Sequence, residues 1–143
     1  MIGIGYEGLQ LSELIERLRD EGVSVLVDIR LNAISRKAGY SKRALSAALE
    51  AAGIRYLHDP RLGNPKENRA GYAEAHSPDG TAAREHFRGL LASEPGAQGI
   101  RGLASLLEQE TVAVLCYEAD EAHCHREQVI AAVRESRHSL VTV

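Results

Sequence analysis

Residues 22–30, GVSVLVDIR, hold an apolar run between a glycine and an arginine, and the fold is best worked out from this stretch. The run from residue 23 to residue 29 lacks the alternation of a strand with one wet face. It is typical of a strand buried on both faces. A second run of this kind, TVAVLCY, occupies residues 111–117. Two such runs predict the central strands of a parallel sheet covered by helices.

The segments around these strands alternate between helical and extended patterns. We predict helices at residues 12–21, 41–52, 81–93, 100–110 and 123–137, with further strands at 2–4, 54–57 and 139–143. Between them, residues 58–80 show no period and contain three of the four prolines, as expected of a loop that is either functional or disordered. The alternation predicts a single α/β domain over residues 1–143, a three-layer, Rossmann-like (doubly wound) fold with a mostly parallel sheet.

Composition narrows the class of protein. The chain is 44% hydrophobic and 26% charged, with a net charge of −3, which is ordinary for a folded domain. No apolar run approaches the roughly 20 residues that span a bilayer, so no membrane association is expected. Two cysteines, with no charged and apolar leader after Met1, indicate a cytoplasmic protein with reduced thiols.

Positive charge is concentrated in one part of the chain. Residues 30–69 contain nine basic and three acidic residues, a net charge of +6, while the rest has eight basic and seventeen acidic residues, a net charge of −9. Parallel topology brings the carboxyl ends of strands together. We therefore expect Arg30, Arg36 and Arg126 to share one cleft with the turn GYEG at residues 5–8. Five cations would form a basic rim there: Arg36, Lys37, Arg61, Lys66 and Arg69.

Asp28 and Arg30 stand at alternate positions of a strand end, so their side chains should lie on one side and form a charge-assisted pair. The pair would either hold Arg30 ready for a ligand or act only as a structural ion pair.

Three glycines, Gly3, Gly5 and Gly8, match the GxGxxG pattern of dinucleotide-binding folds, and Asp28 follows 20 residues after the last. Only two residues precede Gly3, however, and the helix is expected near residue 12. A tight turn with Tyr6 and Glu7 at its tip is favoured over a nicotinamide site, and no cofactor is predicted.

The stretch CYEADEAHCHRE, residues 116–127, contains several possible zinc ligands. Neighbouring ligands point apart and no CxxC or HxxxH spacing is present, so we predict no metal. Cys116 ends an apolar strand, where a cysteine usually behaves as a small buried hydrophobic residue. Cys124 lies at a predicted helix N-terminus beside histidines and Arg126, which favours a thiolate. We expect Cys124 to be the more reactive thiol.

Taken in order, four segments resemble the family catalogued as domain of unknown function 488. They are GYEG, LVDIR with SRKAGYSK, GIRYLHDPRLGNPKENR, and LCYEADEAHCHRE. Members are small bacterial and archaeal proteins, and the resemblance implies a signature rather than a reaction. The matching positions are Gly5, Tyr6, Glu7, Asp28, Arg30, Ser35, Arg36, Gly63, Cys116, Glu118, Cys124, His125 and Arg126. This chain departs from the pattern at Ala33 and Ala38, where the second motif has prolines.

These observations predict an electropositive pocket for an anionic ligand, such as a phosphate-bearing one, at the carboxyl end of the sheet. If the protein is an enzyme, Cys124 is its nucleophile or redox centre, and Glu118 or His125 moves protons. The expected ligand-binding residues are Gly5, Tyr6, Glu7, Asp28, Arg30, Ser35, Arg36 and Arg126. The alternative is a nucleotide- or nucleic-acid-binding module in which the cysteines have no chemical role.

Overall fold

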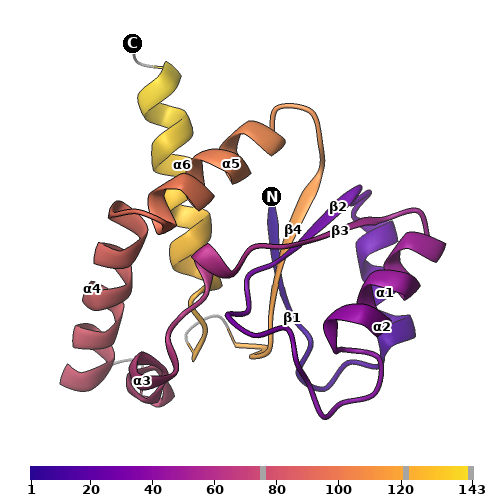
Figure 1. Cartoon of the computed structure of the whole chain (residues 1–143), viewed down its shortest axis with the longest axis horizontal. Coiled ribbons are helices and arrows are strands. Elements are labelled where there is room, and N and C mark those ends of the chain that lie inside the picture. Colours follow the sequence, from indigo (N-terminus) through magenta and orange to yellow (C-terminus); the bar gives the residue numbers. More distant parts are fainter. Residues whose placement is uncertain (75–76, 121–122, 142–143) are drawn as a thin grey trace.

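A computed structural model describes residues 1–74, 77–120 and 123–141 of the chain (Figure 1). These residues form an α/β structure around a four-stranded parallel sheet with the strand order β1-β4-β2-β3. The strands are β1 (Ile2–Gly5), β4 (Val112–Cys116), β2 (Val25–Asp28) and β3 (Arg55–His58). The predicted α/β class and parallel sheet are confirmed.

The two apolar runs form the two central strands, and each buries side chains on both faces of the sheet. Val25 and Val27 of β2 belong to one core, and Leu26, between them, belongs to the other. Val112 and Val114 of β4 likewise alternate with Ala113 and Leu115. Both alternating sets are apolar because helices exclude water from both faces.

Helices cover the two faces of the sheet, which gives three layers (Figure 1). One face packs against α1 (Leu11–Asp20) and α2 (Lys42–Ala51). The other packs against α4 (Pro78–Ala92), α5 (Gly96–Leu106) and α6 (Arg126–Val141). None of the helices within the described residues is long and apolar enough to cross a membrane.

Gly22, after α1, has a φ of +68°, a left-handed conformation that side chains with a Cβ rarely adopt. The turn lets the amide of Val23 donate to the carbonyl of Leu18 and leads directly into β2. Gly22 therefore ends the helix as the sequence predicts.

Two predicted segments differ from the structure. The strand expected at residues 139–143 is wrong, because residues 139–141 continue α6 and residues 142–143 lie outside the described residues. Residues 126–141 contain no glycine or proline that would end the helix, so the helix continues through the apolar residues at its end. The supposedly irregular segment 58–80 contains three short helices: η1 (Pro60–Leu62), α3 (Lys66–Arg69) and η2 (Ala70–Ala73). Such short turns carry too few residues for a detectable period.

Candidate functional site

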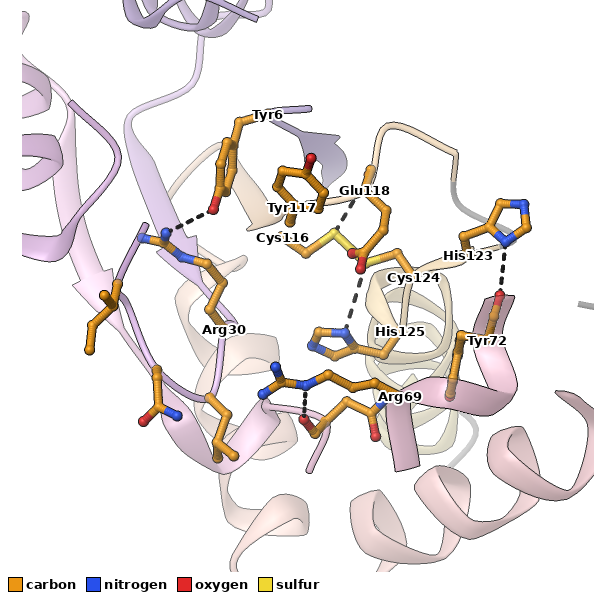
Figure 2. A pocket seen from close by; sticks show the side chains of 14 residues that line it. Tyr6, Arg30, Arg69, Tyr72, Cys116, Tyr117, Glu118, His123, Cys124 and His125 are labelled. Carbon is orange, nitrogen blue, oxygen red and sulfur yellow. Dashed lines mark hydrogen bonds between the residues drawn. A yellow bond between two sulfur atoms is a disulfide. The ribbon is translucent and has the colours of Figure 1, made fainter. Parts of the chain in front are cut away.

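A pocket of about 160 Å³ lies over the carboxyl ends of β1, β4 and β2, which are neighbours in the sheet (Figure 2). The segment after β3 closes it from the side. The pocket is lined by Tyr6, Arg30, Leu31, Asn32, Ile34, Asn64, Arg69, Tyr72, Cys116, Tyr117, Glu118, His123, Cys124 and His125. Five of the predicted site residues therefore meet in one place: Tyr6, Arg30, Glu118, Cys124 and His125.

The sulfur atoms of Cys116 and Cys124 are joined in a disulfide at this pocket (Figure 2). Cys116 ends β4 and Cys124 precedes α6, so the bond closes the loop between strand and helix. The expectation of reduced thiols is wrong for this structure, because neither cysteine is free. A sequence separation of 8 lets the loop fold back and bring the two sulfurs together, but the spacing does not by itself predict the bond. Cys116 therefore lines the pocket together with Cys124.

The guanidinium of Arg126 is buried directly behind the disulfide. Its Nη1 lies 3.0 Å from the Sγ of Cys116 and also donates to the carbonyl of Glu118, and its Nη2 donates to the carbonyl of Ala119 at 2.8 Å. The backbone amide of Arg126 faces the other sulfur, 3.4 Å from the Sγ of Cys124. With 2% of the residue exposed, Arg126 supports the sulfurs and does not line the pocket.

Arg30 lies on the opposite side of the pocket and is held by a carboxylate. Its Nε and Nη2 donate to the two oxygens of Asp28 at 2.9 and 2.6 Å, which confirms the predicted pair. The hydroxyl of Tyr56 donates to the same carboxylate, and Arg30 Nη1 donates to the hydroxyl of Tyr6. Burial alone would lower the pKa of Arg30, but the hydrogen bonds to Asp28 and its negative charge outweigh burial and raise that pKa.

His125 lies between the disulfide and β2. Its Nε2 is 3.0 Å from the carbonyl of Ile29, and its Nδ1 is 3.8 Å from the Sγ of Cys124. Burial lowers the pKa of His125 to about 4, so the ring is neutral at pH 7. A carbonyl can only accept, so the single ring proton is on Nε2, and Nδ1 presents a lone pair to the sulfur.

The segment after β3 supplies one side of the pocket. Arg69 donates from Nε to the carbonyl of Asn64 at 3.0 Å. The Nδ1 of His123 lies 2.8 Å from the carbonyl oxygen of Tyr72. Asn64 and Tyr72 were not predicted. Their only signal is their place in an aperiodic loop at the right end of the sheet. Of the five cations expected in the basic rim, only Arg69 lines the pocket.

Several predicted ligand residues shape the loops instead of lining the pocket. A Cβ on Gly5 would lie 1.8 Å from the carbonyl oxygen of Glu118, so only glycine allows the two loops to approach this closely. Glu7 accepts from the amide of Ala119 at 3.0 Å. Ser35 donates its amide to Ser41 and accepts from the amide of Lys37 through its hydroxyl.

Of the three arginines predicted to share the pocket, Arg30, Arg36 and Arg126, only Arg30 lines it. Arg36 is exposed and does not line the pocket, and Arg126 lies beneath the sulfurs. The basic site proposed from charge counts is therefore smaller than expected, with Arg30 and Arg69 as its arginines.

Cys116, Glu118 and Cys124 place possible metal-ligand atoms within 4.8 Å of one another. In the disulfide the two sulfurs are bonded to each other and cannot act as two thiolate ligands. The guanidinium 3.0 Å from Cys116 also disfavours a second cation there. That the protein binds no structural metal stays a prediction.

Comparison with protein families gives one match. The model described as "Domain of unknown function DUF488" matches residues 10–133, so the chain belongs to this family. No curated protein and no solved structure matches the chain.

Proposed function

We propose that this member of the DUF488 family is a thiol–disulfide enzyme that acts on a small anionic molecule. The observation that carries the proposal is the Cys116–Cys124 bond at a pocket with charged and polar sides. A cysteine pair that forms a bond in place can cycle between dithiol and disulfide without a change of fold. The proposal retains the enzyme hypothesis from the sequence, in which Cys124 is a redox centre, and adds Cys116 as its partner.

The size and burial of the site restrict its substrate. Only 1% of Cys116 and 3% of Cys124 are exposed, and both are reached through a pocket of about 160 Å³. A folded protein partner cannot bring its own thiol to such a site. We therefore propose a small molecule, or a slender group of a larger one, as the substrate.

Arg69 supports a ligand that carries a negative group, while Glu118 adds one carboxylate to the same lining. Asp28 already balances the charge of Arg30, so Arg69 is the cation on which anion binding would depend. Its guanidinium is oriented by the bond from Nε to the carbonyl of Asn64. A planar guanidinium suits carboxylate, sulfonate and phosphate groups.

The proposal is tested by asking whether the pair turns over. The oxidised protein would be reduced with dithiothreitol, freed of reductant, and mixed with a neutral disulfide, hydroxyethyl disulfide, or an anionic one, dithiodiglycolate. We expect each reduced protein to consume one disulfide and reform its own bond, faster with the anionic compound. If the native pair resists reduction, or if the reduced pair ignores both compounds, the proposal fails.

Two substitutions separate charge from chemistry. Arg69→Ala should slow the reaction of dithiodiglycolate several-fold and leave that of hydroxyethyl disulfide unchanged, because only the first has a charge to hold. Lys66→Ala, in the same short helix and outside the pocket lining, is the matched control. The alternative, a nucleotide- or nucleic-acid-binding module, predicts salt-sensitive binding of nucleic acid that survives Cys116→Ser and Cys124→Ser.

A further inference from the structure

The two sulfurs of the pair have different surroundings, and the difference assigns them different roles. We infer that in the reduced protein Cys116 is the thiolate that attacks the substrate, that Cys124 is the resolving thiol, and that Arg126 is the positioning residue that makes this choice. The inference rests on the proposed function and reverses the order that the sequence predicts for the two thiols.

The sulfur of Cys116 lies beside a permanent positive charge. Nη1 of Arg126 is 3.0 Å from this sulfur, and a guanidinium does not lose its proton in proteins. The contact is buried, with Arg126 2% exposed, so solvent screens the attraction weakly. A charge-assisted bond of this kind stabilises the thiolate and not the thiol.

Cys124 has two weaker neighbours. The amide of Arg126 lies 3.4 Å from its sulfur, at the N-terminus of the 16-residue helix α6, and contributes only part of a charge. The Nδ1 of His125, at 3.8 Å, presents a lone pair. A lone pair accepts the proton of a thiol and repels a thiolate, so this contact favours the protonated form of Cys124.

Three other charged groups line the pocket, and within the described residues no hydrogen bond or ion pair ties any of these groups to one sulfur more than to the other. A carboxylate oxygen of Glu118 lies within 4.8 Å of both sulfurs, so it raises the cost of ionising either one. Arg30 is paired with Asp28 on the far side of the pocket. Arg69 lines the pocket that both cysteines face. Among the described residues, Arg126 is the one whose guanidinium hydrogen-bonds to the sulfur of Cys116.

With a disulfide R–S–S–R′ as substrate, the steps balance. The Cys116 thiolate attacks one sulfur, forms Cys116–S–S–R and releases R′–S⁻. The thiol of Cys124 then gives its proton to R′–S⁻, which leaves as R′–SH, and attacks Cys116 Sγ, which forms the protein disulfide and releases R–S⁻. The substrate is reduced, the protein is oxidised, and an external dithiol restores it.

The test measures ionisation in each single-cysteine protein. Cys124→Ser keeps Cys116, and Cys116→Ser keeps Cys124; thiolate absorbance at 240 nm is followed from pH 5 to pH 10. We expect the midpoint for Cys116 to lie at least about one pH unit below that of an ordinary thiol, about 8.5, and the midpoint for Cys124 to lie at or above it. A lower midpoint for Cys124 would overturn the assignment.

Labelling of the intact pair gives an independent measurement. After reduction, a brief iodoacetamide pulse at pH 7 followed by mass mapping should modify Cys116 roughly tenfold faster than Cys124. Arg126→Gln in the Cys124→Ser background should raise the Cys116 midpoint towards 8.5. In the Cys116→Ser background it should leave the Cys124 midpoint nearly unchanged. If Arg126→Gln fails to fold, the two single-cysteine midpoints still decide.

Failure of this inference differs from failure of the proposed function. A pair that turns over small disulfides but ionises first at Cys124 refutes the assignment alone. A pair with a low midpoint at Cys116 that no small disulfide oxidises refutes the proposed function alone. A dithiol that ionises at Cys116 only when zinc is added would refute the role of Arg126, because the metal would then be the charge that matters.

Discussion

Two buried arginines lie at the same end of the sheet, Arg30 in the loop after β2 and Arg126 at the start of α6, and they have different partners. In the loop after β2, Arg30 is matched by the full carboxylate of Asp28. At the start of α6, directly after the loop that follows β4, Arg126 contacts the sulfur of Cys116 and backbone carbonyls. The first arrangement satisfies its own charge and builds a fixed side of the pocket. The second places a positive charge beside a sulfur that can ionise once the disulfide is reduced.

The two sites differ in the group that the arginine meets, a carboxylate for Arg30 and a cysteine sulfur for Arg126. A carboxylate holds a guanidinium in place, whereas a guanidinium beside a thiol would lower the pKa of that thiol. The following changes test this difference, from the largest expected effect to the smallest.

Asp28→Ala should be the most damaging single change. It removes the carboxylate that accepts from Arg30 and from the hydroxyl of Tyr56 and leaves a buried positive charge without its counterion. We expect the free energy of unfolding to fall by about 3–5 kcal/mol. Urea unfolding at pH 7 measures it. Glu118→Ala, which removes a half-buried carboxylate at the pocket, is the control and should cost less than about 1 kcal/mol.

Acid should act on the loop after β4 through His125. Burial lowers its pKa from 6.5 to about 4, so the unfolded chain binds this proton at a pH where the folded chain does not. This contribution to stability is fully present above pH 6.5 and is lost as the pH falls towards 4, and the total loss amounts to roughly 3 kcal/mol. Unfolding of wild type and His125→Gln at pH 7 and pH 4 isolates it. Equal pH dependence of the two proteins would contradict the burial of a neutral ring.

Reduction of the disulfide should weaken the loop after β4 and leave the loop after β2 intact. A cross-link over a sequence separation of 8 lowers the entropy of the unfolded chain and so adds roughly 2–3 kcal/mol to the free energy of unfolding. Urea midpoints with and without a phosphine reductant measure this loss. The double variant Cys116→Ser with Cys124→Ser should show no response to reductant, and a response there would point to a cause other than the bond.

Tyr6→Phe should have the smallest effect. It removes the hydroxyl that accepts from Nη1 of Arg30 at 3.2 Å and keeps the ring stacked on Tyr40. We expect a loss of about 1 kcal/mol, since Asp28 still holds the guanidinium. Tyr117→Phe, at a ring that is 46% exposed, is the matched control. A loss as large as that of Asp28→Ala would mean that Arg30 depends on the tyrosine and not on the carboxylate.

Most of the fold follows from local pattern. The apolar runs at 23–29 and 111–117 predicted the two central strands, because burial on both faces demands apolar side chains at every position. The final strand was mistaken because a short apolar run suits either a strand or the end of a helix. The short helices after β3 lie below the length at which a period can be seen.

The candidate site divides in the same way. Tyr6, Arg30, Glu118, Cys124 and His125 were predicted, because unusual residues after parallel strands gather at one sheet end. Asn64 and Tyr72 were not, since their loop has no pattern that fixes which side chains turn inward. Arg36 was expected in the pocket and does not line it, for the same reason.

By itself the sequence determined the layers of the fold, the sheet end that carries the site and the Asp28–Arg30 pair, because strand periodicity and the two-residue spacing fix these directions. Only the tertiary structure decided which sulfur Arg126 touches. Its backbone amide stays with Cys124 at the helix start, while its long side chain extends to Cys116. Neighbours in sequence share a backbone, but the reach and direction of a side chain depend on how the strand, loop and helix pack together.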